Sequence, residues 1–122
     1  MPKVLVVEAD AIVRNLMIRV LSRQGLTVYE AASAEEALVL CKALNDEHLD
    51  LVIADHQTSS RDITERILGA CTNTKILQIS GWPFEVVQRE EGLLPGSSFL
   101  QKPFTATKLL ETVETLLSPR TQ

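Results

Sequence analysis

The chain contains few of the residues that mark disulfide-rich, metal-binding or membrane proteins. Cysteine occurs only at positions 41 and 71, too far apart for a metal knuckle and too sparse for a disulfide framework. We therefore expect Cys41 and Cys71 to be reduced thiols in the core. No apolar stretch approaches the roughly 20 residues that a membrane span requires, so we expect no membrane segment and a cytoplasmic location.

The chain also has no large excess or cluster of charges of one sign. The net charge of -4 is spread along the 122 residues, without a basic stripe for nucleic acid or an acidic block typical of a disordered tail. We therefore expect no direct nucleic-acid binding, and protein partners instead. The length and even composition predict one domain over residues 1–122, of which residues 118–122 form a short tail.

What the sequence does contain is an alternation of two hydrophobic periods. Short apolar runs rich in β-branched residues are followed by patterns of helical spacing. Five such units predict a three-layer, doubly wound α/β sandwich, a (βα)5 fold with a five-stranded parallel sheet. The expected strands are residues 4–7, 27–30, 49–54, 75–79 and 98–101, and the expected helices are residues 11–24, 34–44, 63–68, 83–91 and 105–117.

Two of the expected helices begin at recognisable capping residues. Asp10 precedes the first helix, and Ser33 with Glu36 forms a capping box for the second. Gly25 is placed to end the first helix. The expected buried face of that helix consists of Val13, Leu16, Met17, Val20 and Leu21.

Polar residues stand where the predicted strands end. In open parallel sheets the carboxyl ends of the strands meet at one edge, where ligands bind. Taken singly, Asp55 could cap a turn and Lys102 could simply pair with it. Together the residues at these strand ends predict a candidate site made of Glu8, Asp10, Asp55, Ser80 and Lys102.

The order of these residues resembles the signature of response-regulator receiver domains. The resemblance rests on acidic residues after the first strand, Asp55 after the third, Ser80-Gly81 after the fourth and Lys102-Pro103-Phe104 after the fifth. The segment at 99–105 is similar to receivers attached to hybrid sensor histidine kinases. The resemblance covers nearly the whole chain and implies a flavodoxin-like strand order of 2-1-3-4-5.

The resemblance also implies a mechanism. In receivers the aspartate that matches Asp55 accepts a phosphoryl group from a phosphohistidine on a sensor histidine kinase or a histidine phosphotransfer protein. Lys102 and a Mg²⁺ ion would supply positive charge, and the Ser80 hydroxyl would bond a phosphoryl oxygen. Such a chain is a phosphoacceptor, able to lose its own phosphoryl group, rather than an enzyme. By analogy the metal ligands would be Glu8, Asp55 and the backbone carbonyl of Gln57.

The sequence departs from the receiver pattern in two places that touch this site. The usual adjacent acidic pair is Glu8-Ala9 here, so the second position lacks a carboxylate. Asp10 is an alternative ligand, although we expect it to cap the helix. After Asp55 the chain reaches its next helix without the usual proline and glycine. We therefore expect the backbone carbonyl of Gln57 to point less well toward the metal. We therefore expect a weakened Mg²⁺ site.

Three functions follow from these observations. The first is a phosphoacceptor receiver that signals through protein contact. The second is a pseudo-receiver, an interaction module that works without phosphorylation because Ala9 weakens the metal site. The third is a phosphatase with two aspartates one residue apart after the first strand, and Glu8 at the position of its nucleophile argues against it.

The expected output surface lies on the last part of the chain. In receivers the hydroxyl that matches Ser80 moves toward the phosphoryl group, and an aromatic residue three positions before the lysine turns inward. Phe99 holds that position here and has no hydroxyl to hydrate, so we expect its inward state to be favoured. The expected partner or homodimer face is formed by residues 84–91, the fifth strand and the helix at 105–117.

Overall fold

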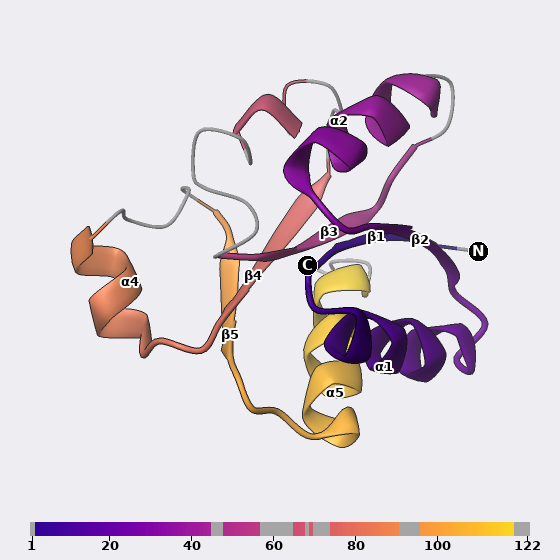
Figure 1. The fold of residues 1–122 in the computed structure, drawn as a ribbon. Helices are drawn as coiled ribbons and strands as arrows, with labels where there is room; N and C mark the ends of the chain where they lie inside the picture. Colours follow the sequence, from indigo (N-terminus) through magenta and orange to yellow (C-terminus); the bar gives the residue numbers. More distant parts are fainter. Residues whose placement is uncertain are drawn as a thin grey trace.

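The computed structural model of the chain describes residues 2–44, 48–56, 65–67, 69, 74–90 and 96–118. Five parallel strands form one sheet in the order β2-β1-β3-β4-β5 (Figure 1). Both the parallel direction and the order of the strands confirm the predicted doubly wound fold. The strands are β1 (Lys3–Val7), β2 (Thr27–Ala31), β3 (Leu51–Asp55), β4 (Lys75–Ser80) and β5 (Ser98–Gln101).

Helices cover both faces of this sheet. The helices α1 (Ala11–Ser22) and α5 (Ala106–Leu117) lie side by side on one face, and α2 (Ala34–Ala43) lies on the other (Figure 1). The short helix α4 (Phe84–Glu90) follows β4. Half of the predicted helix at 63–68 falls outside the described residues, and the described half, 65–67, is helical. Cys71, Gly92 and the end of the predicted helix at 83–91 also lie outside them.

Each face of the sheet has its own hydrophobic core. On one face, alternate residues of the strands pack against α1 and α5 through Met17, Leu21 and Leu109. On the other face, the intervening strand residues pack against α2 through Ala37 and Cys41, and Cys41 is buried in the core as predicted. Because both faces are covered, the strands are continuous apolar runs, as in other parallel sheets. The two cores thereby fix the carboxyl ends of the strands at one edge.

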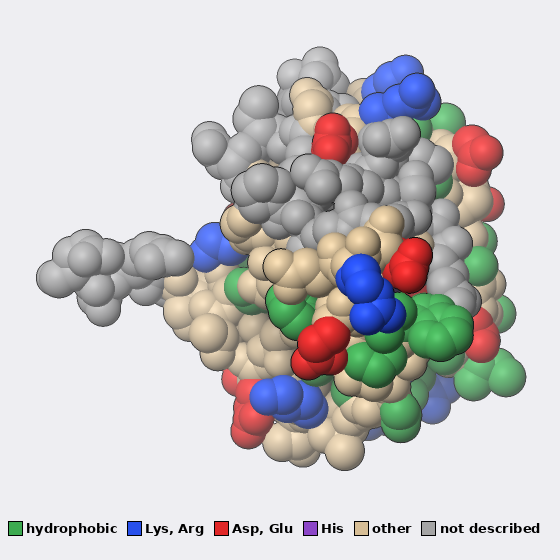
Figure 2. All heavy atoms as spheres, turned by 90° about the vertical axis from the view of Figure 1, so that its left-hand side faces the viewer, with side chains coloured by type: hydrophobic (Ala, Val, Ile, Leu, Met, Phe, Trp, Pro, Cys, Tyr) green, Lys and Arg blue, Asp and Glu red, His purple; other side chains and the backbone are tan. Residues whose placement is uncertain are grey.

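Not every apolar residue of the predicted helices is buried. Leu16 was expected on the buried face of α1, but its side chain is 53% exposed. The prediction was wrong because Val13, Met17 and Leu21 recur every four residues and face the sheet, which turns Leu16 toward solvent. Trp82 and Phe84 are exposed as well. The α4 side of the molecule, which faces the viewer in Figure 2, presents hydrophobic side chains among acidic and basic ones.

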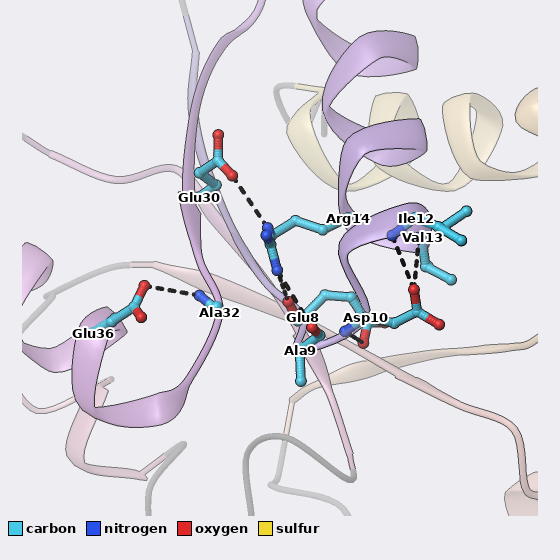
Figure 3. Close-up of polar contacts among 9 residues, drawn as sticks. All are labelled: Glu8, Ala9, Asp10, Ile12, Val13, Arg14, Glu30, Ala32 and Glu36. Atoms are coloured by element: carbon cyan, nitrogen blue, oxygen red, sulfur yellow. Dashed lines mark hydrogen bonds and ion pairs between the residues drawn. The ribbon is translucent and has the colours of Figure 1, made fainter.

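The predicted capping signals hold at both helix starts, with one adjustment. The Ser33 hydroxyl accepts a hydrogen bond from the Glu36 N–H, as a capping box requires. The Glu36 carboxylate accepts from the N–H of Ala32, one residue earlier than in the usual box (Figure 3). Gly25 lies two residues past the C-cap of α1 with a φ of 81°, a conformation that glycine adopts readily. In the described part of the chain, no helix is long and apolar enough to cross a membrane.

Candidate functional site

The carboxyl ends of four strands bring the predicted site residues to one edge of the sheet. Asp55 is the last residue of β3 and Ser80 the last of β4, and both are buried. Two backbone hydrogen bonds continue the pairing past the strand ends, from His56 N–H to the Ile79 carbonyl and from Lys102 N–H to the Ser80 carbonyl, each 2.7 Å. The backbone at the site is therefore held by the same hydrogen-bond pattern as the sheet.

The Lys102 ammonium lies between two buried carboxylates. Its Nζ is 2.7 Å from Oε1 of Glu8 and 3.5 Å from Oδ2 of Asp55. The side chains of Glu8 and Asp55 are 2% and 6% exposed, and that of Lys102 is 23% exposed. Two negative groups and one positive group thus share a space that water barely reaches. Of the two carboxylates, that of Glu8 is the nearer partner of the lysine.

Burial and charge act in opposite directions on these groups. Burial raises the pKa of Glu8 above its ordinary value, although the contact with Lys102 and the Asp10 N–H oppose the change. Burial alone would lower the pKa of Lys102, but the contacts with Glu8 and Asp55 outweigh it, so that pKa is raised. Lys102 therefore carries its charge at neutral pH.

The two carboxylate oxygens of Glu8 are held in different ways. Oε1 forms an ion pair with the Lys102 Nζ at 2.7 Å without hydrogen-bond geometry, and Oε2 accepts a hydrogen bond of 3.1 Å from the backbone N–H of Asp10. The Glu8 backbone is held too, because its N–H donates to the Ala31 carbonyl at 3.0 Å. Few other orientations of the Glu8 side chain would preserve these contacts.

Asp10 is the N-cap of α1, as predicted. Its Oδ1 accepts from the N–H groups of Ile12 and Val13 at 2.9 and 3.3 Å (Figure 3). These bonds satisfy two of the backbone donors that every helix leaves unpaired at its start. The carboxylate that could have replaced the one missing at Ala9 is thus engaged at the helix end.

Arg14 takes part in the site, although no sequence motif singled it out. Its Nη1 donates to the backbone carbonyls of Glu8 at 2.8 Å and Ala9 at 3.4 Å, and its Nε donates to Glu30 at 3.1 Å (Figure 3). A helical side chain points back toward the N-terminus of its helix, which brings Arg14 over the preceding loop. The direction of helical side chains could have indicated from the sequence that Arg14 lies over this loop, but it does not show which carbonyls Arg14 contacts.

The switch residues predicted from the sequence lie on neighbouring strands. The Ser80 Oγ accepts a 3.0 Å hydrogen bond from the Trp82 N–H, which ties the hydroxyl to the turn after β4. Phe99 on β5 is half-buried and meets Phe84 edge to face, with ring centroids 5.5 Å apart. The inward preference of Phe99 stays a prediction, and Gln57 lies outside the described residues.

A family model decides what kind of domain carries this arrangement. The model for the response regulator receiver domain matches residues 4–114, which is most of the chain. The chain belongs to the response regulator receiver family. The strand order and the residues at the strand ends of this receiver agree with that assignment, and it places the chain in two-component signalling.

Relatives of known sequence or structure agree with the family. The sensor kinase CckA of Brucella abortus is 32% identical over 117 residues, which cover 93% of this chain and 12% of that kinase. The receiver therefore spans only a small part of that relative. A crystal structure of a receiver domain from the hybrid histidine kinase CckA is 28% identical with a TM-score of 0.78, over 95% of this chain and 99% of that one. The chemotaxis protein CheY4 of Vibrio cholerae, 24% identical over 96% of this chain and 99% of its own, shares the fold with a TM-score of 0.81.

Receivers imply a Mg²⁺ ion, so the donors present here can be compared with what that ion needs. Mg²⁺ demands octahedral oxygen coordination. In the part of the chain that the structure describes, no three His, Cys, Asp or Glu side chains are grouped as a metal site. Ala9 offers no side-chain donor, Asp10 caps α1, and Glu8 contacts Lys102. As arranged, the described residues do not fit the ligand set that the family implies.

Proposed function

We propose that this receiver accepts a phosphoryl group on Asp55 from a phosphohistidine of a sensor histidine kinase or a histidine phosphotransfer protein. The observation that carries the proposal is the position of Asp55, a buried carboxylate at the end of β3 with the Lys102 ammonium 3.5 Å away. The similarity to a sensor kinase supports the choice of donor. A carboxylate beside a fixed cation in a dry site is suited to attack phosphorus.

The transfer requires little from the protein beyond position and charge. An Asp55 oxygen forms a bond to phosphorus while the phosphorus–nitrogen bond of the phosphohistidine breaks, and the imidazole nitrogen keeps the electron pair of that bond. Negative charge spreads over the phosphoryl oxygens in the transition state, and the Lys102 ammonium stabilises it. Because the Ser80 Oγ accepts from the Trp82 N–H, its own hydrogen can be directed at a phosphoryl oxygen.

The output of the receiver is contact with another protein. Movement of Ser80 toward the phosphoryl group would break its bond to Trp82 and alter the turn that leads to α4. Phe99 packs against Phe84 at the start of α4, so the same change would reach the ring pair. We propose that the face formed by α4, β5 and α5 binds the partner or a second copy of the chain.

A second candidate is a pseudo-receiver that binds partners without phosphorylation. The observation that favours it is the missing carboxylate at Ala9 together with the use of Asp10 as a helix cap. In that case the same face would serve, but its affinity for a partner would not depend on Asp55. The two candidate functions therefore differ in whether partner binding depends on phosphorylation of Asp55.

The deciding experiment is phosphorylation followed by intact-mass measurement. A phosphorylated histidine phosphotransfer protein is mixed with the receiver, in parallel with the Asp55→Asn variant. We expect an added phosphoryl mass on the wild-type chain and none on Asp55→Asn, which keeps the size of the side chain and removes the nucleophile. If partner binding persists while the wild-type chain gains no phosphoryl mass from any donor, the pseudo-receiver is the correct function.

A further inference from the structure

The Lys102 ammonium occupies the space between the two carboxylates that a receiver would otherwise use for a cation. It contacts Glu8 at 2.7 Å and Asp55 at 3.5 Å, and it is itself mostly buried. The two carboxylates approach the same nitrogen from the ends of different strands, since Glu8 directly follows β1 and Asp55 is the last residue of β3. The site therefore already contains a positive charge at its centre.

The ligands that a divalent cation would need are committed elsewhere. A Mg²⁺ ion on Glu8 would have to displace Lys102 from Oε1 or break the bond from the Asp10 N–H to Oε2. Asp10 holds its Oδ1 on the N–H groups of Ile12 and Val13, so movement of that carboxylate toward an ion would uncap α1. The methyl group of Ala9 supplies nothing in return. Each route loses a charge-assisted hydrogen bond or an ion pair, and such contacts are the strong ones in a dry site.

We propose that Lys102, held in place by Glu8, supplies the positive charge of the transfer reaction, so that Asp55 accepts a phosphoryl group without a divalent cation. This inference rests on the proposed phosphoacceptor function and says how the site performs it. Lys102 touches the reacting group, whereas Glu8 is a positioning residue that acts through Lys102. The Glu8 side chain thus serves as an anchor for the lysine rather than as a metal ligand.

The reaction balances with a small phosphodonor and needs no other reactant. In the zwitterion of phosphoramidate the nitrogen already carries three protons. An Asp55 oxygen forms a bond to phosphorus, the phosphorus–nitrogen bond breaks, and ammonia leaves with the electron pair of that bond. Lys102 keeps its protons throughout and contributes only charge. Phosphoramidate is therefore the probe for the test.

The test compares phosphorylation with Mg²⁺ and with EDTA in the wild-type chain and in Ala9→Asp. For the wild-type chain we expect the phosphoryl adduct, measured by intact mass, to form at the same rate in both conditions. Ala9→Asp restores the missing carboxylate, and its rate should rise with Mg²⁺ by about tenfold or more, which corresponds to about 1.4 kcal/mol of transition-state stabilisation. A Mn²⁺ titration followed by electron paramagnetic resonance should show binding to Ala9→Asp and none to wild type.

The role of Glu8 is tested by a double-mutant cycle in EDTA. Lys102→Met should slow phosphorylation by about 10²-fold, as loss of a preorganised charge-stabilising group does. Glu8→Gln should slow the wild-type chain but have no further effect in the Lys102→Met background, because an anchor without its lysine has no function. A purely structural role for Glu8 would lower the rate in both backgrounds. Circular dichroism confirms that each variant is folded.

The outcomes separate this inference from the proposed function. A wild-type adduct that forms only with Mg²⁺, or Mn²⁺ binding as tight as that of Ala9→Asp, would overturn the inference and leave the phosphoacceptor function intact. If neither phosphoramidate nor a phosphohistidine protein modifies wild type or Ala9→Asp in any condition, the proposed function fails and the inference fails with it. An adduct in EDTA that is lost in Asp55→Asn supports both.

Discussion

Replacing Lys102 with methionine would leave Glu8 and Asp55 buried with no cation between them. Breaking a fully buried ion pair by removing one partner costs about 3–5 kcal/mol, whereas exposed pairs contribute about 0–1 kcal/mol. The Lys102 side chain is 23% exposed and that of Glu8 2%, which places this site nearer the buried case. We expect Lys102→Met to lower the free energy of unfolding by about 2–3 kcal/mol at pH 7, between those two limits.

The loss should depend on pH in a defined direction. Contact with Lys102 lowers the pKa of Glu8, so removing the lysine raises that pKa further. The ion pair stabilises only the ionised form of Glu8, so its contribution is lost as that carboxyl is protonated. The difference between wild type and Lys102→Met should therefore be full at a pH well above the raised pKa of Glu8 and should shrink as the pH falls through that pKa, which lies above the ordinary value of 4.5 for Glu.

Urea unfolding followed by circular dichroism at neutral and acidic pH measures this difference. In thermal unfolding at neutral pH, the melting temperature of Lys102→Met should be about 10 °C below that of wild type, given about 3–5 °C per kcal/mol for a domain of this size. Lys108→Met is the matched control, since Lys108 is exposed on α5 and the same substitution there should change stability by no more than about 0.5 kcal/mol. A loss below about 0.5 kcal/mol for Lys102→Met, or one that is equal at both pH values, would refute the reasoning.

Substitutions at three other places in the structure can be tested by urea unfolding. Asp10→Ala should cost about 1 kcal/mol because it removes the N-cap of α1, while Asp10→Asn, which still accepts the two N–H bonds, should cost much less. Leu109→Ala should cost about 2–5 kcal/mol, since Leu109 is fully packed between α5 and the sheet. Phe84→Ala and Phe99→Ala should show a coupling of about 0.5–1.5 kcal/mol in a double-mutant cycle, and additive losses would mean that the ring pair contributes nothing.

The sequence was sufficient to predict the fold because each prediction used a local pattern. Five apolar runs with intervening helical patterns leave little choice but a parallel sheet covered on both faces, and the observed sheet agrees, while its strand order was implied by the resemblance to receivers. The same reasoning brought Asp55, Ser80 and Lys102 to one edge, since parallel strands end on the same side. The capping role of Asp10 was also local, and it was predicted correctly.

What the sequence could not supply was the pairing within the site. Glu8 and Lys102 are far apart along the chain, and no spacing rule indicates that their contact is shorter than that of Lys102 with Asp55. The contacts of Arg14 depend on the path of the loop at Ala9, which has no periodicity. Leu16 fits the helical pattern as well as Met17 does, and only the seating of α1 on the sheet decides which is buried.

The contacts of Arg14 make the loop between β1 and α1 move with the helix. Its guanidinium binds two carbonyls of that loop, while the Glu8 carboxylate accepts from the N–H of the cap residue. If α1 shifted by a fraction of an ångström on the sheet, Glu8 would shift as well, and Lys102 would have to follow or lose its nearer partner. A protein that docks on the exposed surface of α1 would therefore change the position of the Lys102 ammonium beside Asp55 through the contacts of Arg14 and Glu8, without itself contacting Lys102.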